Sequence, residues 1–213
     1  MKIVCLANSF RLGGRCVGGV ELDANNNPVF HAGRPKWIRP VLHTAHEEVP
    51  VDLVSNISLL DIIEFDVEEV GGHGHQTENV IFIPTSLCRN GTFPSARANE
   101  ITDNNRFPLL FGNRGAAVPE TNMHLYTHSL TLLEVTNFEV NERVFPGKPF
   151  PQKKLSFTYN TNNYNLPITD PAFIHRYETN RNLLQGVERT FLTVSLSAPN
   201  ETWLYKLVAG IIF

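Results

Sequence analysis

Short stretches in which apolar residues run continuously or alternate with polar residues occupy most of the chain. Residues 2–9 begin as a nearly continuous apolar run and end in turn-forming Asn8 and Ser9, a pattern typical of a strand covered on much of both faces. Gly18 and Gly19 interrupt the next strand pattern and predict a bulge or sharp bend. Further strands are predicted over residues 16–22, 29–30, 36–42, 59–67 and 78–83. Short strands spaced by turns favour a small barrel over alternating strands and helices.

The pattern changes after residue 84 and returns near residue 123. Residues 84–124 are rich in Pro, Gly, Asn and Arg and predict a long connection with one short helix at most. Residues 172–186 carry apolar residues on roughly one face and predict a helix. The second set of strands is predicted over residues 123–140, 153–159, 164–171, 190–196 and 203–213. We therefore expect a first barrel over residues 1–84, a loop-rich connection over 85–122 and a second barrel over 123–213.

Two strand patterns share a Leu-Leu-x-x-x-x-Phe-x-Val arrangement. It occurs within residues 59–67 and within residues 129–140. The similarity suggests an internal duplication that relates the two halves.

Composition limits the classes of partner. The 213 residues are 42% apolar and 18% charged, which is enough to bury a sizeable core. A net charge of −3 argues against coating nucleic acid by bulk electrostatics, and it leaves room for a local basic site. No apolar window reaches the length of a membrane span, and the first apolar run is too short for a signal peptide. Three cysteines without a CxxC spacing favour a reduced, cytoplasmic protein.

Residues 34–41 combine a tryptophan with arginines and a lysine. In a strand, Trp37 and Arg39 share one face, while Ile38 lies on the other. If Ile38 faces the core, Trp37 and Arg39 are presented together outside it, beside Arg15. Such a cluster can stack on a base and contact phosphate. The alternative is a half-buried tryptophan with arginines that pair with nearby acids.

Other polar residues offer weaker candidates. Gln76 and Asn79 can contact base edges or sugar hydroxyls, although backbone capping is the commoner use of such residues. Asp170 lies at a strand end near Tyr164. A hydrolase needs a second carboxylate, such as Glu78, beside it, whereas a helix N-cap ahead of a proline needs none.

The histidines do not predict a metal site. The pairs with close spacing are His43 and His46, His73 and His75, and His124 and His128. None comes with a cysteine pair or an HExxH arrangement, so we expect no metal and no cofactor. The strand-like pattern around His124 and His128 separates those two further.

Several short motifs recur in a fixed order along nearly the whole chain. They cover residues 4–9, 14–21, 37–40, 60–64, 76–79, 164–171, 191–196 and 205–209. By their order and spacing, these motifs together resemble the dual OB-containing domain family of bacterial proteins. The resemblance implies two OB-like barrels in tandem, and the habits of that fold imply oligonucleotide or oligosaccharide binding.

We therefore expect a mainly β protein made of two tandem OB-like barrels with one or two short helices. The function favoured is a non-catalytic module that binds single-stranded nucleic acid or a nucleotide through an aromatic and arginine surface on the first barrel. The alternatives are a metal-dependent hydrolase or nuclease, and a scaffold for a protein partner; no membrane partner is expected. The predicted ligand contacts are Arg15, Trp37, Arg39, Gln76, Asn79, Tyr164, Asp170 and Lys206.

Overall fold

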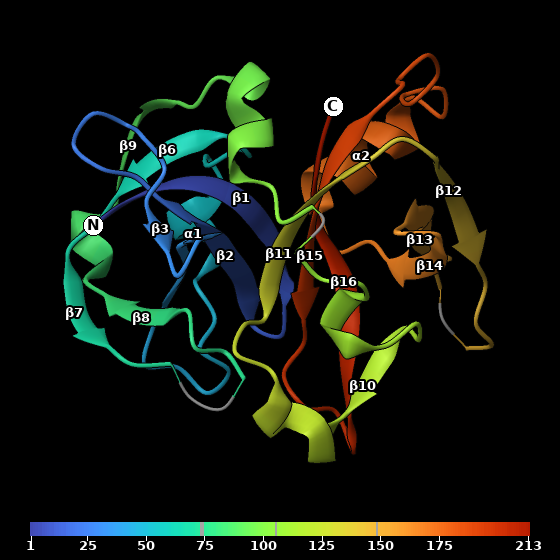
Figure 1. The fold of residues 1–213 in the computed structure, drawn as a ribbon, viewed down its shortest axis with the longest axis horizontal. Helices are drawn as coiled ribbons and strands as arrows, with labels where there is room; N and C mark the ends of the chain where they lie inside the picture. Colours follow the sequence, from blue (N-terminus) through green and yellow to red (C-terminus); the bar gives the residue numbers. More distant parts are fainter. Residues whose placement is uncertain (73–74, 105, 148) are drawn as a thin grey trace.

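The computed structural model describes residues 1–72, 75–104, 106–147 and 149–213, and it contains two groups of strands that follow each other along the chain. In Figure 1 the first group lies on the left, in blue to green, and most of the second lies on the right, in yellow to red. The first group comprises β1 (Lys2–Arg11), β2 (Gly14–Glu21), β3 (Phe30–His31), β4 (Arg34–Pro35), β5 (Trp37–Val41), α1 (Val51–Val54), β6 (Asp61–Glu64), β7 (Val67–Val70), β8 (Asn79–Phe82), the 3-10 helix η1 (Pro84–Ser86), β9 (Cys88–Thr92) and the 3-10 helix η2 (Ser95–Ile101).

The first group forms a closed ring of strands. Its sheet runs β7-β8-β5-β2-β1-β6-β9, with β5 and β8 parallel and the other neighbours antiparallel. Only Phe65 and Asp66 separate β6 from β7. Strands β6 and β7 therefore act as one bent strand, whose β6 end pairs with β1 and whose β7 end pairs with β8. The ring encloses a core that includes Ile3, Val17 and Ile38.

The second group repeats this plan. Strand β12 pairs with β13 and β13 with β14, while β11 pairs with β15 and β15 with β16. Ile168, just after β14, forms a parallel bridge to Val208 of β16, and this bridge closes the ring. The elements are η3 (Leu110–Gly112), β10 (Ala117–Pro119), η4 (Glu120–Leu125), β11 (Leu130–Val135), β12 (Phe138–Arg143), β13 (Gln152–Tyr159), β14 (Asn162–Pro167), α2 (Pro171–Thr179), β15 (Thr190–Leu196) and β16 (Trp203–Ile212).

Both rings place their strands in the same order. In chain order the five strands of the first ring are β1, β2, β5, β6 with β7, and β8, and those of the second are β11 with β12, β13, β14, β15 and β16. In each ring the third and fifth strands are parallel, and a helix connects the third strand to the fourth (α1 in one ring, α2 in the other). The stretches with the shared Leu-Leu-x-x-x-x-Phe-x-Val pattern do not correspond. Residues 59–67 belong to the fourth strand of the first ring, and residues 129–140 belong to the first strand of the second. The interpretation of this pattern as a duplicated element is therefore wrong.

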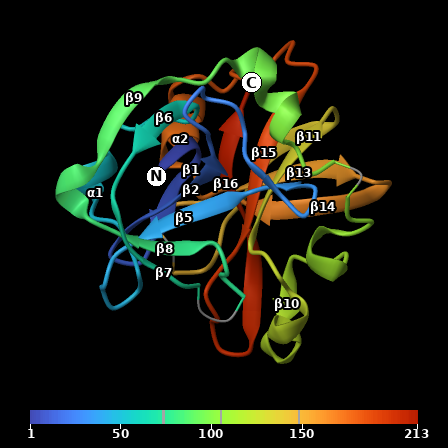
Figure 2. The same cartoon turned by 60° about the vertical axis from the view of Figure 1, so that its left-hand side comes forward.

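The two rings pack directly on each other along β1, β11 and β16, at the centre of Figures 1 and 2. A separate apolar cluster joins them; it includes Leu6 and Val20 from the first ring and Leu130 and Ile212 from the second. The bulge predicted within the strand of the glycine pair lies instead in its partner, because β1 carries Leu6 as an extra residue opposite Gly18 and Gly19.

The bulge serves the contact between the rings. The Leu6 carbonyl accepts a hydrogen bond from Thr193 Oγ1 at 2.6 Å. A Cβ on Gly210 would lie 2.2 Å from the same oxygen, so β16 approaches β1 this closely only with a glycine at that position.

The stretch between the rings contains more structure than the sequence pattern indicates. Residues 85–122 include β9, which joins the first sheet, and β10, which joins the second. The boundaries predicted at residues 84–85 and 122–123 stay a prediction. The second ring's first strand begins at Leu130, later than the predicted residue 123, because residues 120–125 form η4. No helix among the described residues is long and apolar enough to span a membrane.

Candidate nucleic-acid interface

The predicted alternation around Trp37 is present, but the face that carries Trp37 and Arg39 is covered. Ile38 packs into the first ring's core, and Trp37 packs into the apolar cluster between the rings. Trp37 is 5% exposed and Arg39 is 1% exposed. The expectation of an exposed Trp37 and Arg39 surface is therefore wrong, because β11 of the second ring lies against the same face. A Cβ on Gly18 of β2 would stand 3.0 Å from Leu130 Cδ1.

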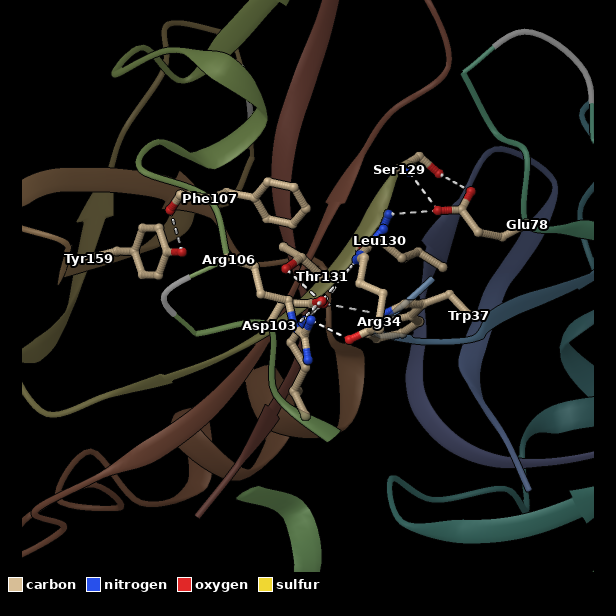
Figure 3. A network of polar contacts seen from close by, with 12 residues as sticks. Arg34, Trp37, Glu78, Asp103, Arg106, Phe107, Ser129, Leu130, Thr131 and Tyr159 are labelled. Carbon is tan, nitrogen blue, oxygen red and sulfur yellow. Dashed lines mark hydrogen bonds and ion pairs between the residues drawn. The ribbon is translucent and has the colours of Figure 1, made fainter. Parts of the chain in front are cut away.

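Asp103 holds Trp37 in this position. Its fully buried carboxylate accepts hydrogen bonds from Trp37 Nε1 at 3.3 Å and from Arg34 Nε and Nη2 at 2.9 and 3.2 Å (Figure 3). Thr131 Oγ1 and the Leu132 amide complete the set at 3.1 and 3.3 Å. The donors come from both rings, so one carboxylate ties the first ring to β11.

A second buried carboxylate lies close to Arg39. Glu78 accepts hydrogen bonds from the Ser129 amide, the Ser129 hydroxyl and the Leu130 amide, at 2.6, 2.9 and 3.2 Å (Figure 3). Arg39 Nη2 donates to Ser129 Oγ at 2.9 Å, and its Nη1 donates to Asn79 Oδ1 at 3.4 Å. These polar residues fix the entry of β11 into the interface.

Two predicted ligand contacts of the second ring, Lys206 and Tyr164, form hydrogen bonds within the protein instead. Lys206 is completely buried and donates to the Asn113 carbonyl and Oδ1 at 2.8 and 2.7 Å. Burial lowers its pKa to about 7. Tyr164 accepts from the Leu110 amide and donates to the Asn113 carbonyl.

Asp170 is the N-cap of α2, the second of the two roles that the sequence left open. Its carboxylate accepts from the Phe173 amide at 3.0 Å and from the Ile211 amide at 3.2 Å, with Pro171 in the first turn. Burial raises its pKa, and these backbone hydrogen bonds oppose the rise.

The histidines show no grouping typical of a metal centre within the part of the chain that the structure describes. His75 and His128 are both buried, and burial lowers the pKa of each to about 4. His128 stacks on Phe107 with ring centroids 4.6 Å apart. His124 lies in η4 and His128 lies beyond it, and His73 lies outside the described residues.

A groove of about 940 Å³ runs between the rings, close to Gln76. Its first-ring wall carries Phe10, Arg11 and Leu12 from the β1–β2 hairpin, and its second-ring wall includes Tyr205. Phe10 is 53% exposed and Tyr205 is 39% exposed. Exposed aromatic rings on both sides of a groove are a feature that the sequence pattern does not predict, because the groove exists only once the two rings are joined.

The outer face of β13 and β14 adjoins this groove. Gln152 and Pro167, at one end of that face, line the groove. From there the face continues along Lys154 and Asn165 to a shallow hollow that Ser156, Thr158 and Asn163 line. Unlike the equivalent face of the first ring, this one is not covered by another sheet in the described part of the chain.

The loop that joins β12 to β13 borders this face. Phe150 is 80% exposed there, and the Arg143 guanidinium lies 4.6 Å from the centre of the Phe145 ring. Burial, with a contribution from Arg143, lowers the pKa of Lys154. The two cations are therefore near each other at the edge of the open face.

Two five-stranded rings, each with a parallel pair of third and fifth strands and a helix before the fourth strand, define a tandem of OB-type barrels. The predicted fold class is thus confirmed. Domains of this type commonly bind nucleic acids, through the face of their second and third strands and the adjacent loops. The family model of the dual OB-containing domain matches residues 1–211, and the chain belongs to that family.

The likeness to solved structures extends over the whole chain at low identity. The crystal structure of the p204 HINb domain is 11% identical, with 98% of this chain and 95% of that chain covered and a TM-score of 0.37. A structure described as the molecular basis for abrogation of activation of pro-inflammatory cytokines is 9% identical, with 100% and 92% covered and a TM-score of 0.32. Similarity at this level does not enter the functional argument. No protein with a curated description matches the sequence.

Proposed function

We propose that the protein binds single-stranded nucleic acid, without chemistry, along the open face of the second barrel and the groove between the barrels. One observation carries the proposal. The face of β13 and β14, where OB barrels bind their ligands, is open and leads at Gln152 and Pro167 into a groove with exposed aromatic rings. The equivalent face of the first barrel is occupied by β11, so the proposed surface differs from the Trp37 and Arg39 surface expected from the sequence.

The aromatic rings supply the contacts to bases. Trp203 and Tyr205 project from the same face of β16, and they are 42% and 39% exposed. Residues two apart on a strand are separated by about 7 Å, which suits successive bases of an extended single strand. Phe10 lies on the opposite wall of the groove from Tyr205. Stacking of this kind contributes about 1–3 kcal/mol per base and tolerates any sequence.

Few cations accompany these rings. Arg11 lines the groove and pairs with Glu47 at 3.5 Å, and Lys154 and Arg143 border the open face. With a net charge of −3 the protein offers only a local basic path. We therefore expect a shallow dependence of affinity on salt, corresponding to about two or three phosphate contacts.

The test is a titration of a labelled single-stranded oligonucleotide, followed by fluorescence anisotropy at low salt. We expect Tyr205→Ala to weaken binding by about 5- to 100-fold through lost stacking. Lys154→Ala should weaken it less and reduce the salt dependence by about one phosphate contact. Phe30→Ala, at an exposed aromatic residue on β3 outside the groove, and Arg189→Ala, at an exposed arginine paired with Glu134, are the matched controls.

Two results contradict the proposal. One is no binding up to about 100 µM protein, the weak end of non-specific affinity. The other is binding that Tyr205→Ala weakens no more than Phe30→Ala does.

No contact among the described residues favours the hydrolase alternative. Its two expected carboxylates, Asp170 and Glu78, each accept hydrogen bonds from backbone amides that fix α2 and β11.

A further inference from the structure

A second cavity, of about 540 Å³, lies on the other side of the junction between the barrels. Its walls come from the end of β1, the start of β2, the 55–60 connection, the start of α2 and the end of the chain. Asn8, Arg15, Ser58, Arg176, Ile211 and Phe213 are among the residues that line it. The volume is in the range typical of small-molecule sites.

Arg15 reaches this cavity without a carboxylate partner. Its guanidinium lies 4.8 Å from the centre of the Phe10 ring, and no ion pair within the described residues includes it. Its Nη1 atom is buried and has no hydrogen-bond partner in the described part of the chain. An arginine that lines a cavity and has no carboxylate partner among the described residues is available to an anion bound there.

Arg176 approaches the same cavity from α2. Its guanidinium lies 4.7 Å from the centre of the Phe213 ring, and it too forms no ion pair with any described residue. Each arginine therefore has one planar side against an aromatic ring, which leaves the N–H groups at its edge for an acceptor. Two arginines from different barrels on one cavity suit an anion with several oxygens, as phosphate has.

The remaining walls limit the class of ligand. The Asp170 carboxylate is also part of the wall, but its oxygens accept from two backbone amides, and it caps α2, so the helix terminus itself is not free for an anion. Ser58 and Asn8 add polar groups, and the Asn8 Oδ1 atom is buried without a partner among the described residues. The apolar residues of the wall include Ile57, Leu59, Leu60, Ile211, Ile212 and Phe213.

We propose that this cavity binds a small phosphorylated compound with a flat apolar body, of the class of nucleoside monophosphates, with Arg15 and Arg176 on the phosphate. The apolar wall contacts the base, and Ser58 and Asn8 are in reach of the sugar. The proposal does not depend on the binding of single-stranded nucleic acid, because that surface lies in a different cavity.

The experiment is isothermal titration of the full chain with adenosine monophosphate, adenosine and inorganic phosphate as separate probes. Adenosine monophosphate should bind at least about 10-fold more tightly than either of the others, because it alone engages both the arginines and the apolar wall. Arg15→Gln and Arg176→Gln should each weaken its binding by about 10- to 100-fold, the effect of losing hydrogen bonds to a charged group. Arg189→Gln, at an arginine that lines neither cavity, should not change it.

Arg176 is exposed on α2, so Arg176→Gln keeps the test usable if Arg15→Gln fails to fold. Tyr205→Ala should leave binding of the monophosphate unchanged. This variant therefore distinguishes a failure of the oligonucleotide proposal from a failure of the monophosphate proposal. The absence of any heat of binding with adenosine monophosphate at about 5 mM, a concentration above a dissociation constant of about 1 mM, would overturn the inference. Equal losses in Arg176→Gln and Arg189→Gln would also overturn it, as would inorganic phosphate binding as tightly as the monophosphate.

Discussion

Removal of the Asp103 carboxylate should loosen the contact between the two barrels. The carboxylate has no exposed surface, and it accepts hydrogen bonds from Arg34, Trp37, Thr131 and the Leu132 amide. The change Asp103→Asn keeps the shape of the side chain and removes its charge. The side-chain NH2 group of Asn cannot accept hydrogen bonds, and it would stand where one carboxylate oxygen accepts them. At least one buried donor therefore loses its partner.

The expected loss of unfolding free energy follows from the burial of the ion pair between Asp103 and Arg34. Removing one partner of a buried ion pair costs about 3–5 kcal/mol. The Arg34 side chain retains 20% of its exposure and can regain water, which favours the lower end for Asp103→Asn. Asp103→Ala removes every acceptor and should reach the upper end. Either value is a large part of the roughly 5–15 kcal/mol that stabilises a folded protein.

Equilibrium unfolding in urea, followed by tryptophan fluorescence, measures this free energy. Trp37 reports directly, because its Nε1 atom lies 3.3 Å from the carboxylate. The matched control is Glu100→Gln, which removes the charge from an exposed carboxylate paired with Arg97, and it should produce no measurable change. In a double-mutant cycle with Arg34→Met, the double variant should be less destabilised than the sum of the two single variants.

Equal changes in the free energy of unfolding for Asp103→Asn and Glu100→Gln would contradict a stabilising role of the Asp103 carboxylate. So would effects of Asp103→Asn and Arg34→Met that are additive within about 0.5 kcal/mol, since residues that share a buried hydrogen bond should couple.

Three further predictions concern buried positions. Gly210→Ala should destabilise the protein by about 1–3 kcal/mol, measured by the same urea titration, because its Cβ would meet the Leu6 carbonyl at 2.2 Å; an unchanged midpoint would contradict this. Stability should fall as the pH drops from 6.5 towards 4, because His128 binds a proton in the unfolded chain at a pH where the folded protein does not; this loss should be about 2–3 kcal/mol smaller in His128→Phe, and an identical pH profile would refute it. Lys206 has a folded pKa of about 7, below its ordinary value, so stability should rise as the pH increases from 7 to 10; Lys206→Met should flatten that rise, as thermal unfolding across the range can check.

Strand positions and fold class could be predicted from the sequence because they depend on local alternation and on turn residues. The strand predicted over residues 190–196 is found there, and the helix predicted from residue 172 begins at Pro171. The missed elements lack such a pattern. All five residues of β9 are exposed, so no apolar alternation marks the strand.

The environment of Trp37 could not be predicted in the same way. Alternation correctly separates Trp37 and Arg39 from Ile38, but it does not say what lies against either face. The partner of Trp37 is Asp103, 66 positions later in a stretch without periodicity. Burial of a strand face by a second domain depends on how two barrels are arranged, and no local pattern records that arrangement.

The arrangement of the barrels makes the two OB-type faces unequal. Burial of the β2 and β5 face removes one ligand surface, and the same contact brings the Phe10 to Leu12 hairpin beside the open face of β13 and β14. A ligand that occupies the groove contacts both barrels, whereas a ligand confined to β13 and β14 contacts one. Loosening of the interface by Asp103→Asn should therefore weaken an oligonucleotide that spans the groove more than a shorter one that fits on β13 and β14 alone. Equal weakening of both would place the ligand on a single barrel, and the groove would then have no part in recognition.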